Sequence, residues 1–186
     1  MRFTPLLWLI GLITPVAIAS DVNACSEAYH GRAVDAVTGQ PIQGAVIVVE
    51  WTKKAIVAMD GPMHVHKIVE GLTDAGGNFT VEACAGIDWN PVTFVNGHPL
   101  ITIFEPGYSP WPLRSDPLEP QDFERMLREG GTVKLLRPNG SEDVRRFTTP
   151  TSVGLFAYPP PAHIPNLIRL LNIQRESIGM PVYPEP

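Results

Sequence analysis

The chain has 186 residues, of which 44% are hydrophobic and 18% charged, and its formal net charge is −5 at pH 7. An acidic chain without a basic run interleaved with aromatic residues lacks the electrostatic footprint of a DNA- or RNA-binding protein, so we expect no nucleic-acid partner. The 20 prolines and 16 glycines favour a loop-rich β protein over a helical one.

The N-terminal stretch has the pattern of a secretory signal peptide. Arg2 precedes an apolar run from Pro5 to Ile18, and the run closes with an A-x-A arrangement that ends at Ala19. The run is broken by prolines and is shorter than the about 20 residues of a membrane-spanning helix, which favours cleavage over an uncleaved anchor. We therefore expect a periplasmic or secreted protein with no stable membrane span after cleavage.

Residues 31–51 predict two strands joined by a turn-rich connection. The first strand runs into Asp35, whose side chain can bond its own backbone two residues on. The turn-forming residues after it are Thr38, Gly39, Pro41 and Gly44. Residues 45–51, AVIVVEW, then form a β-branched run of strand length, and their apolar continuity predicts a core strand buried on both faces.

A short glycine-rich connection follows at residues 74–78, DAGGN. It lies between the apolar pair Ile68-Val69 and the run from Phe79 to Val81, which is the usual signal of a β-hairpin. We therefore expect the strands on its two sides to pair in antiparallel fashion.

Three pieces of sequence carry a resemblance: GRAVDAVTGQPIQGAVIVV from Gly31, TDAGGNF from Thr73 and FEPGY from Phe104. In this order they resemble the carboxypeptidase regulatory-like domain family, over roughly Glu27 to Tyr108. The resemblance implies a transthyretin-like β-sandwich of about seven strands with Greek-key connections. It implies no catalytic residues, because domains of this family are accessory modules and a fold does not by itself imply a function.

Both cysteines, Cys25 and Cys84, remain after cleavage at Ala19. An exported chain meets an oxidising compartment, where a pair of cysteines is usually joined, so we expect a disulfide. It would tie the N-terminal lead-in to the end of the strand that finishes near Ala83. The alternative is a lipobox that ends at Cys25 and makes the protein lipid-anchored, although Asn23 is atypical of that motif.

The segment MDGPMHVHK contains the sharpest chemical signal, the pair His64 and His66. On an extended segment these side chains project to the same face, where two imidazoles could share one copper or zinc ion. The alternative is an edge strand whose histidines simply face water, because two ligands do not complete a metal shell. The other histidines are far away in the sequence: His30, His98 and His163.

Prolines are frequent from Ile87 to Pro120, and within this region only residues 100–104, LITIF, predict a strand. Trp89, Tyr108 and Trp111 could line a carbohydrate or peptide surface. We favour packing for these aromatic residues, since this is their commoner role.

The last third of the chain predicts two helices and a strand. Residues 122–129 have helical spacing, and their charges are most simply a solvated face. Residues 132–136 predict the final sandwich strand. An apolar stripe from Ile164 to Leu171, opened by Pro165, predicts a C-terminal helix that docks on the protein itself, because a short isolated helix is marginal in water.

The expected organisation is a signal peptide at 1–19, a carboxypeptidase regulatory-like sandwich at 20–138 and a proline-rich extension with a helix at 139–186. The sequence has no G-x-S-x-G, H-E-x-x-H, P-loop or dinucleotide motif, so we expect no enzyme, no catalytic residues and no cofactor. The predicted function is an exported binding or interaction module of the bacterial cell envelope, with a protein or carbohydrate ligand. The alternatives are a periplasmic copper or zinc binder through His64 and His66, and a small hydrolase on a transthyretin-like fold.

Overall fold

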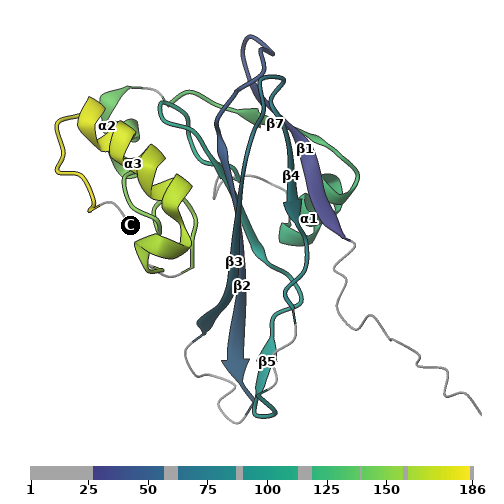
Figure 1. Cartoon of the computed structure of the whole chain (residues 1–186). Coiled ribbons are helices and arrows are strands. Elements are labelled where there is room, and N and C mark those ends of the chain that lie inside the picture. Colours follow the sequence, from purple (N-terminus) through teal and green to yellow (C-terminus); the bar gives the residue numbers. More distant parts are fainter. Residues whose placement is uncertain are drawn as a thin grey trace, which may run out of the picture.

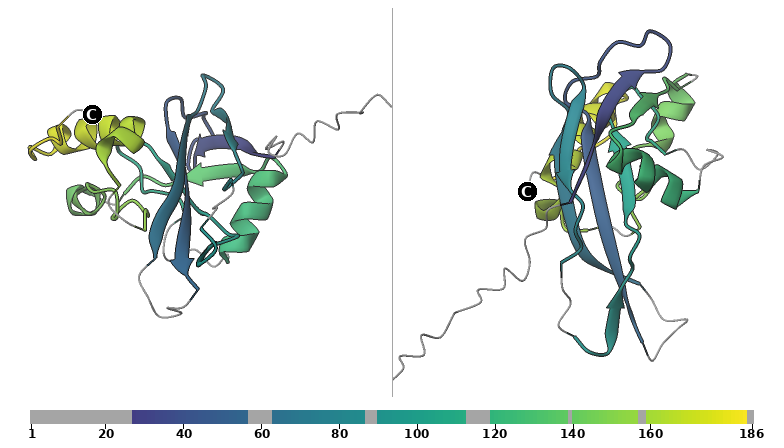
Figure 2. Two further views of the ribbon diagram at one scale, coloured as in Figure 1. Left: turned by 60° about the horizontal axis from the view of Figure 1, so that its bottom comes forward. Right: turned by 90° about the vertical axis from the view of Figure 1, so that its right-hand side faces the viewer.

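The computed structural model describes residues 27–56, 63–86, 90–112, 119–138, 140–156 and 159–184. In this part of the chain the protein is mainly β, with two sheets packed against each other and helices on either side (Figures 1 and 2). The prediction of a mainly β sandwich with a C-terminal helix is confirmed. The predicted signal peptide lies outside the described residues.

Each sheet is built around one central strand. The first sheet has the order β4-β1-β7, with β1 (Ala28–Asp35), β4 (Asn78–Glu82) and β7 (Thr132–Leu135). Here β1 is antiparallel to β4 and parallel to β7. In the second sheet β2 (Val46–Ala55) pairs antiparallel with β3 (His64–Leu72), β5 (Thr93–Val95) and β6 (Leu100–Phe104).

The inner face of β2 packs against the first sheet. Ile47, Val49 and Trp51 alternate along the strand and join one buried cluster with Tyr29 and Ala33 of β1. Alternate positions of a strand share a face, so a single β-branched run supplies one wall of this core.

The outer face of β2 packs against the last helix, α3 (Pro165–Ser177). Val46 and Val48 form a second buried cluster with Leu167 and Leu171 of this helix. The prediction that this strand is buried on both faces is therefore confirmed, as is the docking of the C-terminal helix on the protein itself.

The start of α3 is held by a carboxylate from the neighbouring strand. Its N-cap residue, Ile164, has no side-chain capping bond. Instead Glu70 of β3 accepts hydrogen bonds from the backbone N–H groups of Asn166 and Leu167, both at 2.9 Å. These are donors that a helix leaves unsatisfied in its first turn. The contact therefore attaches the helix to the edge of the second sheet.

The connection at 74–78 differs from the expected hairpin, which is a correction to the sequence prediction. The strands on its two sides, β3 and β4, belong to different sheets. Gly77 has a φ of +77°, and an added Cβ would lie 2.4 Å from the backbone oxygen of Ala33. The N–H of Ala33 bonds the carbonyl of Gly77 at 2.8 Å. The turn thus carries the chain across to β1, because glycine permits both this φ and this close approach.

The remaining elements are partly as expected. The helix α1 (Pro120–Arg128) begins two residues before the predicted helical segment and ends one residue before the end of that segment, while β7 confirms the predicted final strand. The sequence did not predict the three-residue β5, nor the short helices α2 (Ser141–Arg146) and η1 (Pro161–His163). Among the described residues, none of the helices has the length and apolar character needed to cross a membrane.

Candidate functional site

A cavity of about 360 Å³ lies where β6 meets α1 and the chain segment 151–156. Most of its lining is apolar. Its lining includes Leu100, Thr102, Phe123, Thr151, Leu155 and Phe156. Small-molecule sites in proteins commonly have volumes of about 300–1,000 Å³ and a mainly apolar lining with a few polar groups, and this cavity lies at the lower end of that range.

Two contacts hold the 151–156 segment against the sheet. Gly154 has a φ of +119°, and a Cβ there would lie 2.7 Å from the hydroxyl oxygen of Thr102. Only glycine lets this turn come so close to β6. The backbone N–H of Phe156 donates to Oε2 of the buried Glu50 at 2.8 Å. The wall of the cavity that residues 151–156 form is therefore fixed to both β2 and β6.

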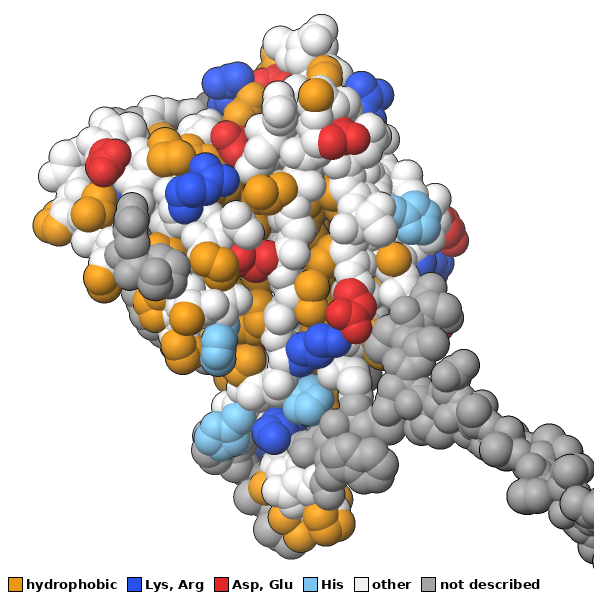
Figure 3. All heavy atoms as spheres, viewed as in Figure 1, with side chains coloured by type: hydrophobic (Ala, Val, Ile, Leu, Met, Phe, Trp, Pro, Cys, Tyr) orange, Lys and Arg blue, Asp and Glu red, His pale blue; other side chains and the backbone are white. Residues whose placement is uncertain are grey.

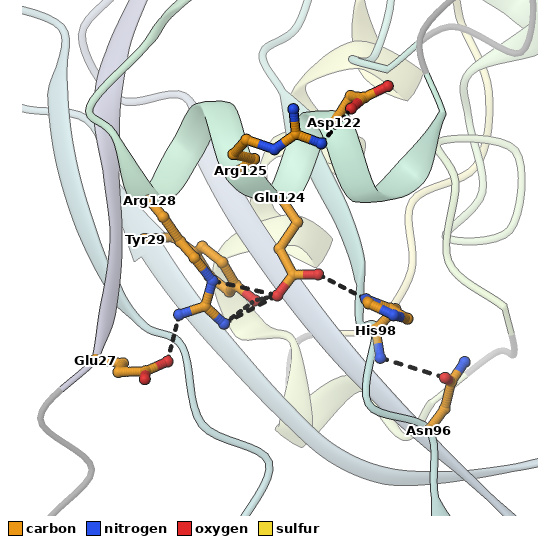
Figure 4. Close-up of polar contacts among 8 residues, drawn as sticks. All are labelled: Glu27, Tyr29, Asn96, His98, Asp122, Glu124, Arg125 and Arg128. Carbon is orange, nitrogen blue, oxygen red and sulfur yellow. Dashed lines mark hydrogen bonds and ion pairs between the residues drawn. The ribbon is translucent and has the colours of Figure 1, made fainter.

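A cluster of polar side chains lies beside this cavity and joins three elements (Figure 4). Glu124 of α1 accepts hydrogen bonds from the Tyr29 hydroxyl on β1 at 2.9 Å and from Nη2 of Arg128 at 2.9 Å. Its second oxygen, Oε2, lies 2.9 Å from Nδ1 of His98, in the segment that leads into β6. Arg128 also pairs with Glu27 and lies over the ring of Tyr29, 5.0 Å from its centre.

The electrostatics of the cluster keep Glu124 ionised and Tyr29 neutral. Burial alone would raise the pKa of Glu124, but the hydrogen bonds from His98, Arg128 and Tyr29 outweigh it and hold that pKa below its usual range. Burial, followed by the hydrogen bond to Glu124, raises the pKa of Tyr29 well above its usual range. A carboxylate only accepts hydrogen bonds, so Nδ1 of His98 carries the proton and donates.

In the neutral form of His98 this leaves Nε2 as the acceptor nitrogen of an oriented imidazole. The His98 side chain is 64% exposed, whereas that of Glu124 is 12% exposed. A carboxylate that fixes the tautomer of a histidine is the usual support of a proton acceptor or a metal ligand. The flanking residues Pro99 and Phe123 line the cavity, so the cluster and the cavity share β6 and α1 as supports.

Sequence reasoning missed this cluster. The charges of residues 122–129 were interpreted as a solvated face, although Glu124 and Arg128 have the i,i+4 spacing of an ion pair on a helix. That spacing was the feature of the sequence that could have predicted the ion pair. Nothing in the sequence linked the pair to Tyr29 or His98, which are far away along the chain.

His64 and His66 both lie on β3, which is an edge strand as the alternative interpretation expected. The pairing register between β2 and β3 shifts between Trp51 and Thr52 of β2. On β3 this irregularity falls between Val65 and Lys67, so it interrupts the regular alternation that would place His64 and His66 on one face. A cavity of about 300 Å³ is lined by His66 and, from η1, His163. Histidine side chains also gather in the lower part of the face seen in Figure 3.

No group of three or more His, Cys, Asp or Glu residues in the described ranges is arranged to hold a metal ion. The metal hypothesis for His64 and His66 therefore stays a prediction. The sequence did not foresee that His66 and His163 line one cavity, because η1 reaches β3 only through the docking of α3.

Of the two cysteines in the predicted disulfide, the structure describes only Cys84. Cys84 follows β4, and its carbonyl accepts a hydrogen bond from Nζ of Lys67 at 2.8 Å. Cys25 lies outside the described residues, so the disulfide and the lipidated alternative both stay predictions.

The aromatic residues 108 and 111 pack, as we expected. Tyr108 is buried and donates its hydroxyl hydrogen to Oδ2 of Asp35 at 2.9 Å. Trp111 stacks edge-on against Phe123, with ring centres 4.8 Å apart. Trp89 lies outside the described residues.

Comparison with known proteins gives no relative: no family model, no curated protein and no solved structure matches the chain. The resemblance to the carboxypeptidase regulatory-like family therefore continues to depend on the three motifs alone.

Proposed function

We propose that this protein is an exported, non-enzymatic binding module of the bacterial cell envelope, built on a transthyretin-like Greek-key sandwich of the carboxypeptidase regulatory-like class. Its ligand occupies the cavity beside β6 and α1. The observation that carries the proposal is this cavity of about 360 Å³, whose lining is mostly apolar and whose walls are fixed to the sandwich.

The lining indicates the class of ligand. Leu100, Phe123 and Leu155 offer apolar surface, while the hydroxyl groups of Thr102 and Thr151 offer a small number of hydrogen bonds. Such a site suits a compact group with one apolar face and a few polar atoms, such as a sugar ring or a peptide side chain. Both fit a protein or carbohydrate ligand at the envelope.

The polar cluster supports binding by stiffening the cavity. Tyr29, Glu124 and His98 come from β1, α1 and the lead-in to β6, so their hydrogen bonds tie together the elements that carry the lining residues. A site whose supports are locked in this way loses less entropy when its ligand binds. The hydrolase alternative would instead use Nε2 of His98 as a general base. Hydrolysis of p-nitrophenyl acetate that disappears in His98→Gln would favour that alternative.

Filling the cavity tests the proposal. Leu100→Trp places a large side chain at the cavity, whereas Leu72→Trp makes the same change at an exposed leucine of β3. Saturation-transfer NMR with a panel of mono- and disaccharides and short peptides should show contacts with the wild type and the Leu72→Trp control, and none with Leu100→Trp. Equal contacts with both tryptophan variants would place binding elsewhere.

The metal-binding alternative has one observation in its favour, the shared cavity of His66 and His163. Calorimetric titration with Cu²⁺ and with Zn²⁺ tests it. Loss of metal binding in His66→Ala and His163→Ala, but not in His64→Ala, would identify the pair that the fold brings together. Loss in His64→Ala and His66→Ala alone would identify the pair expected from the sequence.

A further inference from the structure

After α3 ends, residues 180–184 turn back and lie alongside that helix (Figure 1, yellow). We call residues 181–184, Pro-Val-Tyr-Pro, the tail segment. Asn172 of α3 bonds the main chain of this segment twice: its Oδ1 accepts from the N–H of Tyr183 at 2.8 Å, and its Nδ2 donates to the carbonyl of Tyr183 at 3.1 Å. One amide side chain thus pairs with both polar groups of a single residue, as a neighbouring strand would.

The side chain of Tyr183 is recognised separately. The guanidinium of Arg175 lies over its ring, 4.3 Å from the ring centre, and Nη1 of Arg175 lies 3.2 Å from its hydroxyl oxygen. The hydroxyl donates to the carbonyl of Thr148 at 3.1 Å, and Nε of Arg175 donates to the carbonyl of Pro181. These contacts recognise the tyrosine side chain together with its own main-chain groups and the carbonyl two residues before it.

The tail segment does not fill the surface beneath it. A cavity of about 520 Å³ remains between α3 and the segment, lined by Ile168 and Ile173 of the helix and by Val182 and Tyr183 of the segment. Val182 is 49% exposed, and no residue of the tail segment is buried. Tyr183 packs against the outside of the second hydrophobic cluster, so a peptide that displaces the segment must supply a side chain in its place, and a bulkier peptide can also use the remaining space.

We propose that this face of α3 is a peptide-binding groove, occupied within the same molecule by the tail segment, and that it binds an extended tyrosine-containing peptide from another protein when the tail segment is displaced. Recognition of main-chain groups supplies affinity, and the arginine-stacked tyrosine supplies specificity. The groove is formed by α3 and is separate from the cavity beside β6, so this proposal does not depend on the proposed function.

The test uses a fluorescein-labelled peptide with the sequence of residues 180–186, MPVYPEP, and fluorescence anisotropy. In the wild type the tethered tail segment competes at an effective concentration of the order of millimolar, so the peptide should bind weakly. Tyr183→Ala in the full chain removes the ring and hydroxyl contacts of the tail segment, and it should bind the peptide at least about tenfold more tightly than the wild type. A labelled peptide with alanine in place of tyrosine should not bind either protein.

The groove residues on α3 are tested by adding a second substitution to the Tyr183→Ala variant. Adding Asn172→Asp keeps the size of the side chain but sets an oxygen against the peptide carbonyl, which should abolish binding. Adding Gln121→Glu, the same amide-to-acid change at an exposed position of α1, should leave binding intact. Thermal unfolding followed by circular dichroism checks that each variant is folded. Equal peptide affinity in the wild type and Tyr183→Ala, or binding that does not depend on the peptide tyrosine, would overturn the proposal even if the Asn172→Asp variant failed to fold.

Discussion

The two faces of β2 are buried in different ways. On the inner face, Ile47, Val49 and Trp51 meet the apolar residues of the first sheet. On the outer face, Val46 and Val48 meet α3, but polar contacts complete the attachment of that layer. The inner layer therefore depends on strand alternation, whereas the outer layer combines an apolar cluster with a few specific hydrogen bonds.

Gln174 of α3 is the clearest of these polar contacts. It is 1% exposed, accepts a hydrogen bond from the N–H of Gly107 at 2.9 Å, and donates to the carbonyls of Val144 and Phe147 at 3.2 and 2.7 Å. One side chain thus links α3 to the end of β6 and to the region of α2. A layer held in this way should unfold locally more easily than the inner core.

The largest expected effect separates the two layers directly. Ile47→Ala on the inner face and Leu171→Ala on the outer face each remove a fully buried aliphatic side chain, which costs about 2 to 5 kcal/mol of unfolding free energy. Native-state hydrogen exchange should show that Ile47→Ala lowers protection in both sheets. Leu171→Ala should lower it mainly in α3, and a uniform loss in both variants would show that the layers unfold as one unit.

The second prediction concerns Gln174. Gln174→Ala leaves the N–H of Gly107 and the carbonyls of Val144 and Phe147 without this partner, which should cost about 1 to 3 kcal/mol. Urea denaturation measures the loss. Gln121→Ala, at an exposed position of α1, serves as the matched control and should change the midpoint little. Equal midpoints for both variants would mean that these hydrogen bonds do not hold the outer layer.

The same contrast explains what the sequence could predict. The run AVIVVEW and the stripe from Ile164 to Leu171 predicted a core strand and a docked helix, because periodicity reports which side chains are buried. The prediction of a hairpin at 74–78 was wrong. The close approach of Gly77 to the main chain of Ala33 forms only in the folded protein, where β4 pairs with β1, so the local sequence does not show it. The strand β5 was missed because three residues among prolines carry almost no periodic signal.

The candidate site was less predictable than the fold. The cluster of Tyr29, His98 and Glu124 is assembled only when α1 packs on β1 and meets the segment before β6. The i,i+4 pair of Glu124 and Arg128 could be seen in the sequence, but its partners could not. The Asn172–Tyr183 pairing is likewise invisible to pattern reasoning, because it joins a helix to an irregular segment.

The third prediction is a pH dependence set by Glu105, which follows β6 and faces α3. Burial raises its pKa from 4.5 to about 7, and Arg169 of α3 opposes this only in part. Its Oε2 is buried and finds no hydrogen-bond partner among the described residues. Because the pKa is raised in the folded state, ionisation is disfavoured there, so Glu105 should destabilise the protein progressively as the pH rises from 4.5 to about 7.

Glu105→Gln should therefore raise the unfolding free energy by about 1 to 2 kcal/mol at pH 8 relative to the wild type, after allowance for partial exposure, and by much less at pH 4. Urea denaturation at both pH values measures the difference, and histidine titration cancels in the comparison. Glu176→Gln, at an exposed position of α3, is the control and should give no such pH-dependent gain. An equal gain at both pH values would show that the ionisation of Glu105 is not responsible.

The smallest expected effect lies at the start of α3. Glu70→Gln keeps the size of the side chain but replaces one carboxylate oxygen with an amide group that cannot accept the N–H of Asn166 or Leu167. The loss of one capping bond should cost about 0.5 to 1 kcal/mol. Burial raises the pKa of Glu70 despite these hydrogen bonds, so part of the lost capping is offset by removal of a costly buried charge. Hydrogen exchange should locate the change in the first turn of α3, and an equal loss of protection in β1 would contradict the separation of the two layers.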